Sequence, residues 1–177
     1  MMMFLYILAL LLGLIVVLAL AAPKKYDVSR KIVVNSPLGD TYQYLLLIKN
    51  QDDWSPWKTR DPNMTQEQSG TDGTVGYINR WEGNKDVGMG EQELISFTEN
   101  KSIESELRFL KPWKSVSIGY FLVNEIEPNK TEVVWGFRGE NKVPMNIMML
   151  FYNMDKAVGK DFELGLSNLK AQLEKRS

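Results

Sequence analysis

Apolar and polar positions follow three successive patterns along the chain. Residues 1–22 carry no charged side chain, most segments between Tyr26 and Gly139 alternate loosely between apolar and polar residues, and apolar residues recur at three- and four-residue steps after Pro144. The continuous apolar run predicts a helix long enough to cross a membrane. The period of two predicts a set of β-strands, and the helical period predicts a long terminal helix.

The apolar run ends at Pro23-Lys24-Lys25. At about 1.5 Å per residue, its helix is roughly 33 Å long, which is enough for a hydrocarbon core of about 30 Å. The triplets Ala19-Leu20-Ala21 and Leu20-Ala21-Ala22 resemble the cleavage site of a secretory signal. We favour a retained anchor because the run is longer than a usual signal core and no basic residue precedes it.

The basic residues that follow the run predict its orientation. Lys24, Lys25, Arg30 and Lys31 all lie just after it, and basic residues favour the cytoplasmic side of a membrane. We therefore expect a single-pass membrane protein with its folded domain on the cytoplasmic side. Residues 1–23 form the anchor in this interpretation, and residues 24–177 form one domain of ordinary size.

Between the apolar run and the terminal helix, turn residues separate short alternating segments, which is typical of consecutive antiparallel hairpins. Asn35-Ser36-Pro37 predicts the start of a short helix over 41–48, with a capping side chain followed by proline. Ile103, Leu107 and Phe109 define a dry face of one strand, opposite Glu104, Glu106 and Arg108. The predicted strands are 26–34, 76–82, 89–99, 101–110, 115–127 and 131–139, with a weaker one at 64–68.

The terminal helix carries one apolar stripe that runs from Met148 to Leu173. Because a curved sheet cannot hide its apolar face alone, this helix should lie across it. The predicted fold is α+β, an antiparallel sheet of about six to seven strands wrapped around the helix, with a gap that suits apolar molecules. Gly159 and Gly165 in the helix allow either close approach to the sheet or room for a ligand.

The composition narrows the chemistry that this domain can perform. The 21 basic residues face 22 acidic ones with no strongly basic patch, which argues against nucleic acid as the main partner. Cysteine and histidine are both absent, so a disulfide framework, a thiol nucleophile and the commonest general base and metal ligand are excluded. We predict no catalytic constellation, no metal site and no cofactor.

Aromatic residues are the first candidates for lining the gap. Trp81 and Trp135 lie on strands expected to face the helix, where the alternative is plain core. Trp54 and Trp57 flank a proline after the first helix and could gate the gap or plug the end of the core. Trp113, between Lys111-Pro112 and Lys114, fits an ordinary turn and also a bilayer interface.

Two carboxylates are candidates for acid–base chemistry. Asp155 borders the helical stripe and Glu82 follows Trp81; in a cavity their pKa would be raised, whereas in the alternative they pair with Arg80 or Arg108. The methionine-rich stretch from Met145 to Met154 could be an adaptable pocket wall or plain core. The predicted ligand-binding residues are Trp54, Trp57, Trp81, Glu82, Phe109, Trp135, Met148, Phe151, Asp155 and Phe162.

Several short motifs occur in an order that resembles one known family. They are Ile32-Val33-Val34-Asn35-Ser36-Pro37, Trp54-Ser55-Pro56-Trp57, Asp61-Pro62-Asn63-Met64, Trp81-Glu82-Gly83-Asn84 with Val87-Gly88-Met89-Gly90, and, in the terminal helix, Met154-Asp155-Lys156, Asp161-Phe162-Glu163 and Asn168-Leu169-Lys170. Over Tyr26 to about Leu173 the chain resembles the START/Bet v 1-like superfamily, in particular its SRPBCC polyketide cyclase/dehydrase branch. The resemblance implies a helix-grip fold with a hydrophobic cavity, a lipid-like or other apolar ligand and, in many relatives, an amino-terminal membrane helix.

Three functional hypotheses follow. The leading one is a membrane-anchored domain that binds a hydrophobic small molecule or lipid without transforming it. The second is a cyclase or hydrolase that acts on an apolar substrate through Glu82, Asp155 or a tyrosine. The third is a docking scaffold for another protein, with its interior filled by its own side chains.

Overall fold

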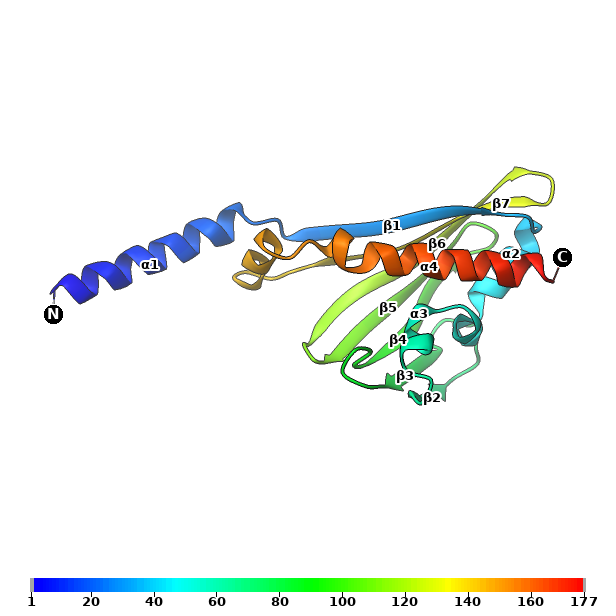
Figure 1. Ribbon diagram of the computed structural model, residues 1–177, viewed down its shortest axis with the longest axis horizontal. Coiled ribbons are helices and arrows are strands. Elements are labelled where there is room, and N and C mark those ends of the chain that lie inside the picture. Colours follow the sequence, from blue (N-terminus) through cyan, green and yellow to red (C-terminus); the bar gives the residue numbers. More distant parts are fainter. Residues whose placement is uncertain (1, 177) are drawn as a thin grey trace.

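The computed structural model describes residues 2–176, so Met1 and Ser177, the outermost residues of the two expected units, lie outside the described residues. The helix α1 (Met2–Ala21) projects away from the rest of the molecule (Figure 1). Its side chains are exposed except near the end, where Ala19 is buried. By length and composition, α1 is long and apolar enough to cross a membrane, a property that signal sequences share.

Seven antiparallel strands form one sheet, in the order β1-β7-β6-β5-β4-β3-β2. Apart from the pairing of the first strand with the last, each strand neighbours the next one in sequence, as expected for hairpins. This sheet packed on a long C-terminal helix confirms the predicted α+β architecture. The strands are β1 (Lys25–Val34), β2 (Thr65–Ser69), β3 (Ile78–Glu82), β4 (Met89–Thr98), β5 (Ser102–Lys111), β6 (Ser115–Glu127) and β7 (Lys130–Glu140).

Three short helical segments, α2 (Leu38–Leu46), η1 (Ile48–Asp53) and α3 (Pro56–Arg60), connect the first two strands. The prediction that a side chain caps α2 just before Pro37 is wrong, because Pro37 itself occupies the N-cap position. Ser36 is instead buried, and its carbonyl accepts a hydrogen bond of 2.9 Å from the hydroxyl of Thr131. The start of α2 is therefore held by the sheet.

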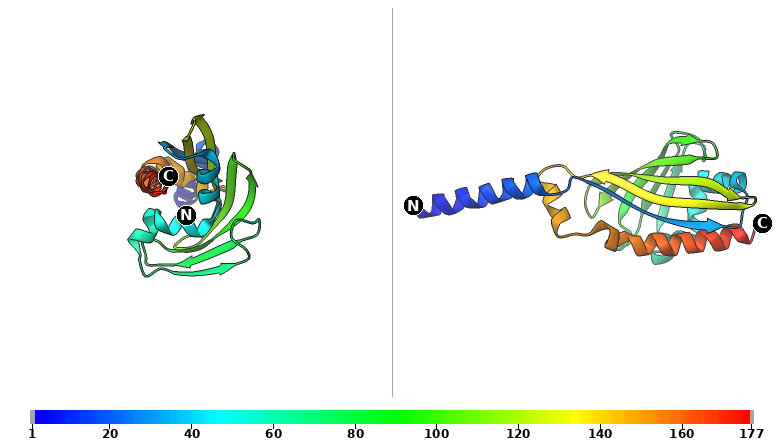
Figure 2. Two further views of the ribbon diagram at one scale, coloured as in Figure 1. Left: turned by 90° about the vertical axis from the view of Figure 1, so that its right-hand side faces the viewer. Right: turned by 90° about the horizontal axis from the view of Figure 1, so that it is seen from above.

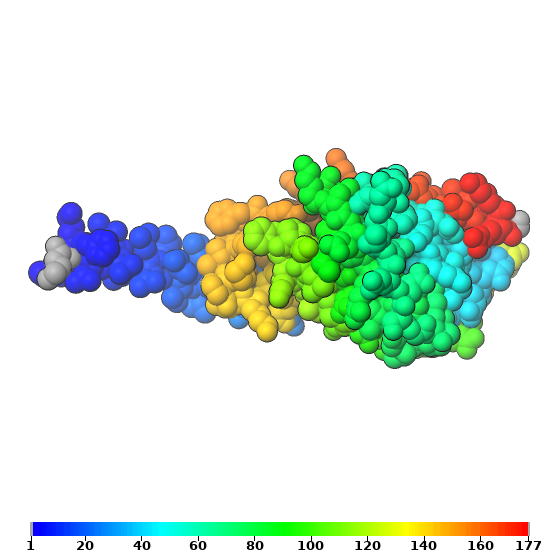
Figure 3. Space-filling model, turned by 90° about the horizontal axis from the view of Figure 1, so that it is seen from below, coloured from blue at the N-terminus to red at the C-terminus, as the bar shows by residue number. Residues whose placement is uncertain are grey.

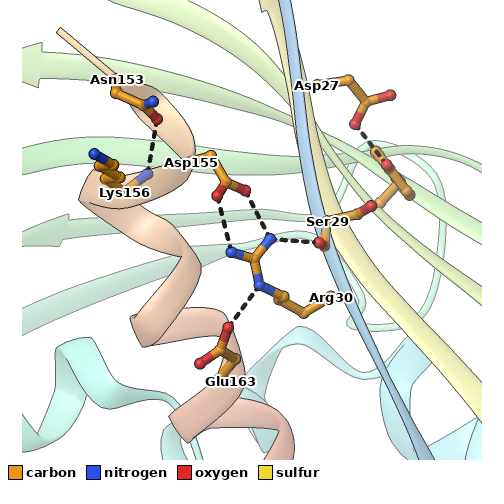
Figure 4. Close-up of polar contacts among 8 residues, drawn as sticks. Asp27, Ser29, Arg30, Asn153, Asp155, Lys156 and Glu163 are labelled. Atoms are coloured by element: carbon orange, nitrogen blue, oxygen red, sulfur yellow. Dashed lines mark hydrogen bonds and ion pairs between the residues drawn. The ribbon is translucent and has the colours of Figure 1, made fainter.

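The terminal helix α4 (Met154–Glu174) begins later than its apolar stripe predicted. The side chain of Asn153 caps it by accepting a hydrogen bond of 2.9 Å from the backbone N–H of Lys156 (Figure 4). The methionine-rich segment before the cap forms a separate 3₁₀ helix, η2 (Met145–Leu150). Met148 and Phe151 therefore do not belong to the packed face of α4.

Helix α4 lies along the sheet beside β1 and β7, whereas the sheet curves away from it toward β2 (Figure 2). Arg30 on β1 donates to Asp155 at 2.7 Å and to Glu163 at 2.8 Å, so one guanidinium joins two turns of α4 to the edge strand (Figure 4). Gly165 allows close contact further along, since a Cβ there would lie 2.5 Å from the ring of Trp135. The glycine prediction is thus confirmed as close approach to the sheet at this position.

The outer face of the sheet carries a network of ion pairs. Arg108 reaches Glu91, Glu93 and Glu106 at 2.5–2.7 Å, and Arg138 reaches Glu104 at 2.7 Å. The predicted wet and dry faces of β5 are confirmed, because Leu107 and Phe109 point to the other side and line a cavity. Alternation along the strands therefore separates a charged exterior from an apolar interior.

Candidate ligand cavity

A cavity of about 240 Å³ lies between the inner face of the sheet and the helical segments η1, α3 and α4. It forms where the sheet turns away from α4, so the two layers cannot close on each other. Most of its wall is apolar. The apolar lining side chains are Trp57, Met64, Trp81, Val87, Leu107, Phe109, Phe121, Trp135, Phe137, Val158 and Phe162.

Trp135 is at the centre of the aromatic wall beside α4. Its ring stacks on that of Phe162, with 4.4 Å between centroids, and on that of Phe121 at 5.9 Å. Trp57 meets it edge-on at 5.6 Å. Because strand, helix and connecting segment all contribute to this cluster, the wall is closely packed on the side where the sheet and α4 are in contact.

Trp54 illustrates how two tryptophans flanking one proline separate in space. Its ring contacts Trp135 edge-on at 4.9 Å, but only 2% of the residue is exposed and it does not line the cavity. Trp54 therefore plugs the core, whereas Trp57 borders the cavity. Of the two alternatives for this pair, plugging the core applies to Trp54, whereas a position at the cavity applies to Trp57.

The far wall, on the half of the sheet that leaves α4, carries polar groups. Asn79 on β3 and Gln92 on β4 are register partners, and both line the cavity together with Ser105. Asn79 is only 8% exposed, and its side-chain Oδ1 has no hydrogen-bond partner within residues 2–176. A buried acceptor without a partner is costly, so this atom is a ready site for a donor from a ligand.

Gln66 and Asp52 extend the polar wall. The side-chain amide of Gln66 on β2 donates to the carboxylate of Asp52 in η1 at 2.9 Å, and both residues line the cavity. Sequence reasoning missed this whole wall. The signal that could have found it is parity, because Asn79 stands two residues before Trp81 on the same face of β3.

Five of the ten predicted ligand-binding residues line the cavity and five do not. The lining ones are Trp57, Trp81, Phe109, Trp135 and Phe162. Trp54 lies in the core, as described above. Glu82, Met148, Phe151 and Asp155 lie outside the cavity, and each placement corrects the expectation for a physical reason.

Glu82 follows the inward-facing Trp81 and so points to the opposite face of β3, where it lies 3.5 Å from Lys111. Met148 and Phe151 precede the cap of α4 and are 55% and 83% exposed. Asp155 faces β1 instead of the cavity. Its partner is Arg30, at 2.7 Å, and neither Arg80 nor Arg108, because β1 is the strand against which α4 packs.

The pKa of Asp155 is shifted in the direction opposite to that expected for a catalytic acid. The hydrogen bond from Arg30 lowers the pKa of this carboxyl below its usual range, whereas a general acid near neutrality needs a raised one. Asp155 is thus a charged partner that holds α4 against β1. Neither of the two carboxylates nominated for catalysis reaches the cavity.

Solved structures with the same fold were found, although no family model and no curated protein matches the sequence. The chain is similar to the ZhuI aromatase/cyclase from Streptomyces sp. R1128, with a TM-score of 0.61, 12% identity and coverage of 86% of this chain and 95% of that one. It is also similar to major latex-like protein 151 from Panax ginseng (TM-score 0.58, 12% identity, 85% and 99% covered) and to Aha1 from Colwellia psychrerythraea (0.56, 18%, 84% and 96%).

These neighbours are Bet v 1-like, or SRPBCC, proteins. The chain has their helix-grip fold. At such low identity the likeness concerns the fold alone.

Proposed function

We propose that this protein binds one hydrophobic small molecule with a polar end in the cavity beneath α4, while α1 holds the domain at a membrane. The observation that carries the proposal is a cavity of about 240 Å³ with one aromatic wall and one amide-lined wall. Ligand pockets commonly enclose about 300–1,000 Å³ and combine an apolar lining with a few polar groups. At about 240 Å³ the cavity lies just below this range, so it suits a small ligand such as a short acyl chain or a small ring system.

The polar wall defines the orientation of the ligand. An apolar body would pack against Trp135, Phe162 and Trp57, because that wall is formed mainly by aromatic rings. A hydroxyl or N–H at the other end would donate to the unpartnered Oδ1 of Asn79. A ligand that satisfies a buried acceptor gains more than one that leaves it unpaired, which selects amphipathic molecules over plain hydrocarbons.

The exposed apolar helix α1 supports a location at a membrane. An all-round apolar helix exposed along its length is stable in lipid, where its backbone groups are satisfied internally. Lys24 and Lys25 follow it immediately, which favours a cytoplasmic domain. Such a tether keeps the cavity close to the phase in which apolar ligands dissolve.

Binding without turnover fits the site better than catalysis. Glu82 and Asp155 lie outside the cavity, and Asp52, which does line it, accepts a hydrogen bond from Gln66. The amides and the hydroxyl of the far wall can hold a polar group but are poor acids and bases at neutral pH. The proposed role is accordingly that of a carrier or sensor.

Native mass spectrometry of the full chain, purified in detergent and exposed to a lipid extract, tests the proposal. We expect a bound small molecule in the native chain and its loss in Ser105→Phe, which fills the cavity from a buried position. The matched control is Ser96→Phe, which adds the same ring at an exposed position on the neighbouring strand. Bare protein from every extract, or equal retention of ligand by both variants, would refute binding in this cavity.

A further inference from the structure

The end of the domain from which α1 departs carries an exposed apolar surface built from two separate segments. One is the β5–β6 turn with Trp113, and the other is η2 with the residues around it (Figure 3). Its large apolar side chains that are more than half exposed, here called the basal surface, are Trp113, Val143, Met145, Met148, Phe151 and Tyr152.

The basal surface differs from the other exposed apolar residues of the domain. Val75, Phe97 and Leu164 are examples that each stand in a different element or loop, and single exposed apolar residues of this kind are common on any protein. The basal surface instead gathers six large side chains at one end, and Trp113 and Phe151 are 77% and 83% exposed. An apolar cluster of this kind marks an interaction site.

A buried asparagine joins this surface to α1. Asn146 in η2 is fully buried, and its side-chain amide donates to the carbonyls of Ala19 at 2.7 Å and Ala22 at 3.1 Å. The last carbonyls of a helix have no partner within the helix, so Asn146 caps the end of α1 from the folded domain. Ala19 and Ala22 are themselves only 4% exposed.

This cap gives α1 a structural role in the domain. Cleavage at either small-residue triplet would remove Ala19 and leave the buried amide of Asn146 without its shorter hydrogen bond. It also fixes where η2 lies relative to the helix. If α1 crosses a bilayer, its carboxyl end lies at the boundary between acyl chains and headgroups, and η2 lies there with it.

We infer that the basal surface is a membrane-interface contact that seats the domain on the bilayer crossed by α1, with Asn146 holding helix and domain in one orientation. Tryptophan, tyrosine and methionine side chains suit the boundary region, and Lys24, Lys25, Lys114 and Lys142 lie exposed at the same end, where they can meet anionic headgroups. The inference rests on the proposed membrane tether and commits to a lipid surface as the occupant.

Depth measurements on the full chain in vesicles test this inference. The chain has no cysteine, so single-cysteine variants can carry an environment-sensitive fluorophore at one site each. The sites are Phe151→Cys and Trp113→Cys on the basal surface, and Leu10→Cys in α1 as a reporter of insertion. A fourth site, Glu127→Cys, is the last residue of β6, next to the β6–β7 turn that lies at the opposite end of the domain (Figure 1).

In vesicles of phosphatidylcholine and phosphatidylglycerol brominated near the top of the acyl chain, we expect blue-shifted emission and quenching at Phe151→Cys and Trp113→Cys, and neither at Glu127→Cys. Asn146→Leu keeps the side-chain volume but removes both hydrogen bonds to α1. It should reduce quenching at residue 151 while the label at residue 10 stays deep.

The outcomes separate this inference from the proposal on which it rests. A deep label at residue 10 with water-exposed labels at residues 113 and 151 overturns the basal contact and leaves the tether intact. A water-exposed label at residue 10 overturns both. If Asn146→Leu does not fold, the labels at residues 113 and 151 in the otherwise native chain still show whether the basal surface touches the bilayer. Ligand binding in the cavity is measured separately, by native mass spectrometry.

Discussion

The two halves of the sheet differ in what covers them. On the half formed by β1 and β7, α4 lies directly on the strands, with Arg30 pairing to Asp155 and Glu163 and Trp135 stacking on Phe162. On the half formed by β3, β4 and β5, the inner face points into the cavity and carries Asn79 and Gln92. One sheet therefore supplies a closed, tightly packed core and an open, partly polar wall.

The comparison shows that the cavity is a consequence of curvature. A helix is straight over its 21 residues, whereas a twisted sheet of seven strands bends away from it. Contact is therefore complete along one edge and lost toward the other. Substitutions in the closed half should act chiefly on stability, and substitutions of the polar groups in the open half should act chiefly on the polar end of the ligand.

The largest effect is expected from removing an aromatic ring in the closed half. Trp135→Ala deletes a ring that contacts Phe121, Phe162, Trp54 and Trp57, and should lower the free energy of unfolding by about 3–5 kcal/mol. Trp81→Ala in the open half is the matched control and should cost less, since its ring has the cavity on one side. Urea denaturation measures both, and equal losses would contradict the division into halves.

A methyl group at the point of closest approach tests how tightly α4 is seated. Gly165→Ala places a Cβ 2.5 Å from Trp135 and should destabilise the fold by about 1–3 kcal/mol, although alanine favours helices. Gly39→Ala in α2 meets no atom within 4 Å and should stabilise it by up to about 1 kcal/mol. Thermal unfolding should therefore shift in opposite directions, and a gain in both would show that α4 can move away from the sheet.

In the open half, Asn79→Leu should separate stability from binding. Removing a buried acceptor that has no partner should raise the stability of the empty protein by about 1 kcal/mol, while the ligand loses its polar contact. Calorimetry and ligand retention in native mass spectra provide the two readouts. Ligand retention unchanged from the native chain would place the polar end of the ligand elsewhere.

The smallest effect is expected from the ion pairs between α4 and β1 at low pH. Because Arg30 lowers the pKa of Asp155, the folded state favours the ionised form, so this contribution is complete above the ordinary carboxyl pKa of about 4 and is lost as the pH falls below it. Asp155→Asn should therefore weaken the fold at pH 7 more than at pH 2.

Urea titrations at the two pH values measure this difference. Asp86→Asn is the control, since its carboxylate forms no salt bridge within the described part of the chain. A stability difference for Asp155→Asn that stays the same at both pH values would show that the pairing with Arg30 contributes nothing that depends on charge.

Periodicity predicted most of the fold because it depends on local alternation. All seven strands and the terminal helix occur where the pattern placed them, with ends that differ by a few residues. The exceptions have tertiary causes. The backbone carbonyl of Ser36 accepts a hydrogen bond from Thr131 on β7, and no side chain caps the start of α2. Asn146 binds the end of α1, and this contact joins residues that are far apart in the sequence.

The sequence by itself determined the uncharged amino-terminal run, the alternation of a wet and a dry face along the strands, and the absence of histidine and cysteine chemistry. Only the tertiary structure decided which inward-facing residues meet a neighbour and which meet empty space. Trp54 and Trp57 stand on either side of one short segment, yet Trp54 is buried in the core and Trp57 lines the cavity. The reason is geometric, since periodicity assigns a face to each residue, whereas the distance from that face to the opposing helix depends on the curvature of the whole sheet.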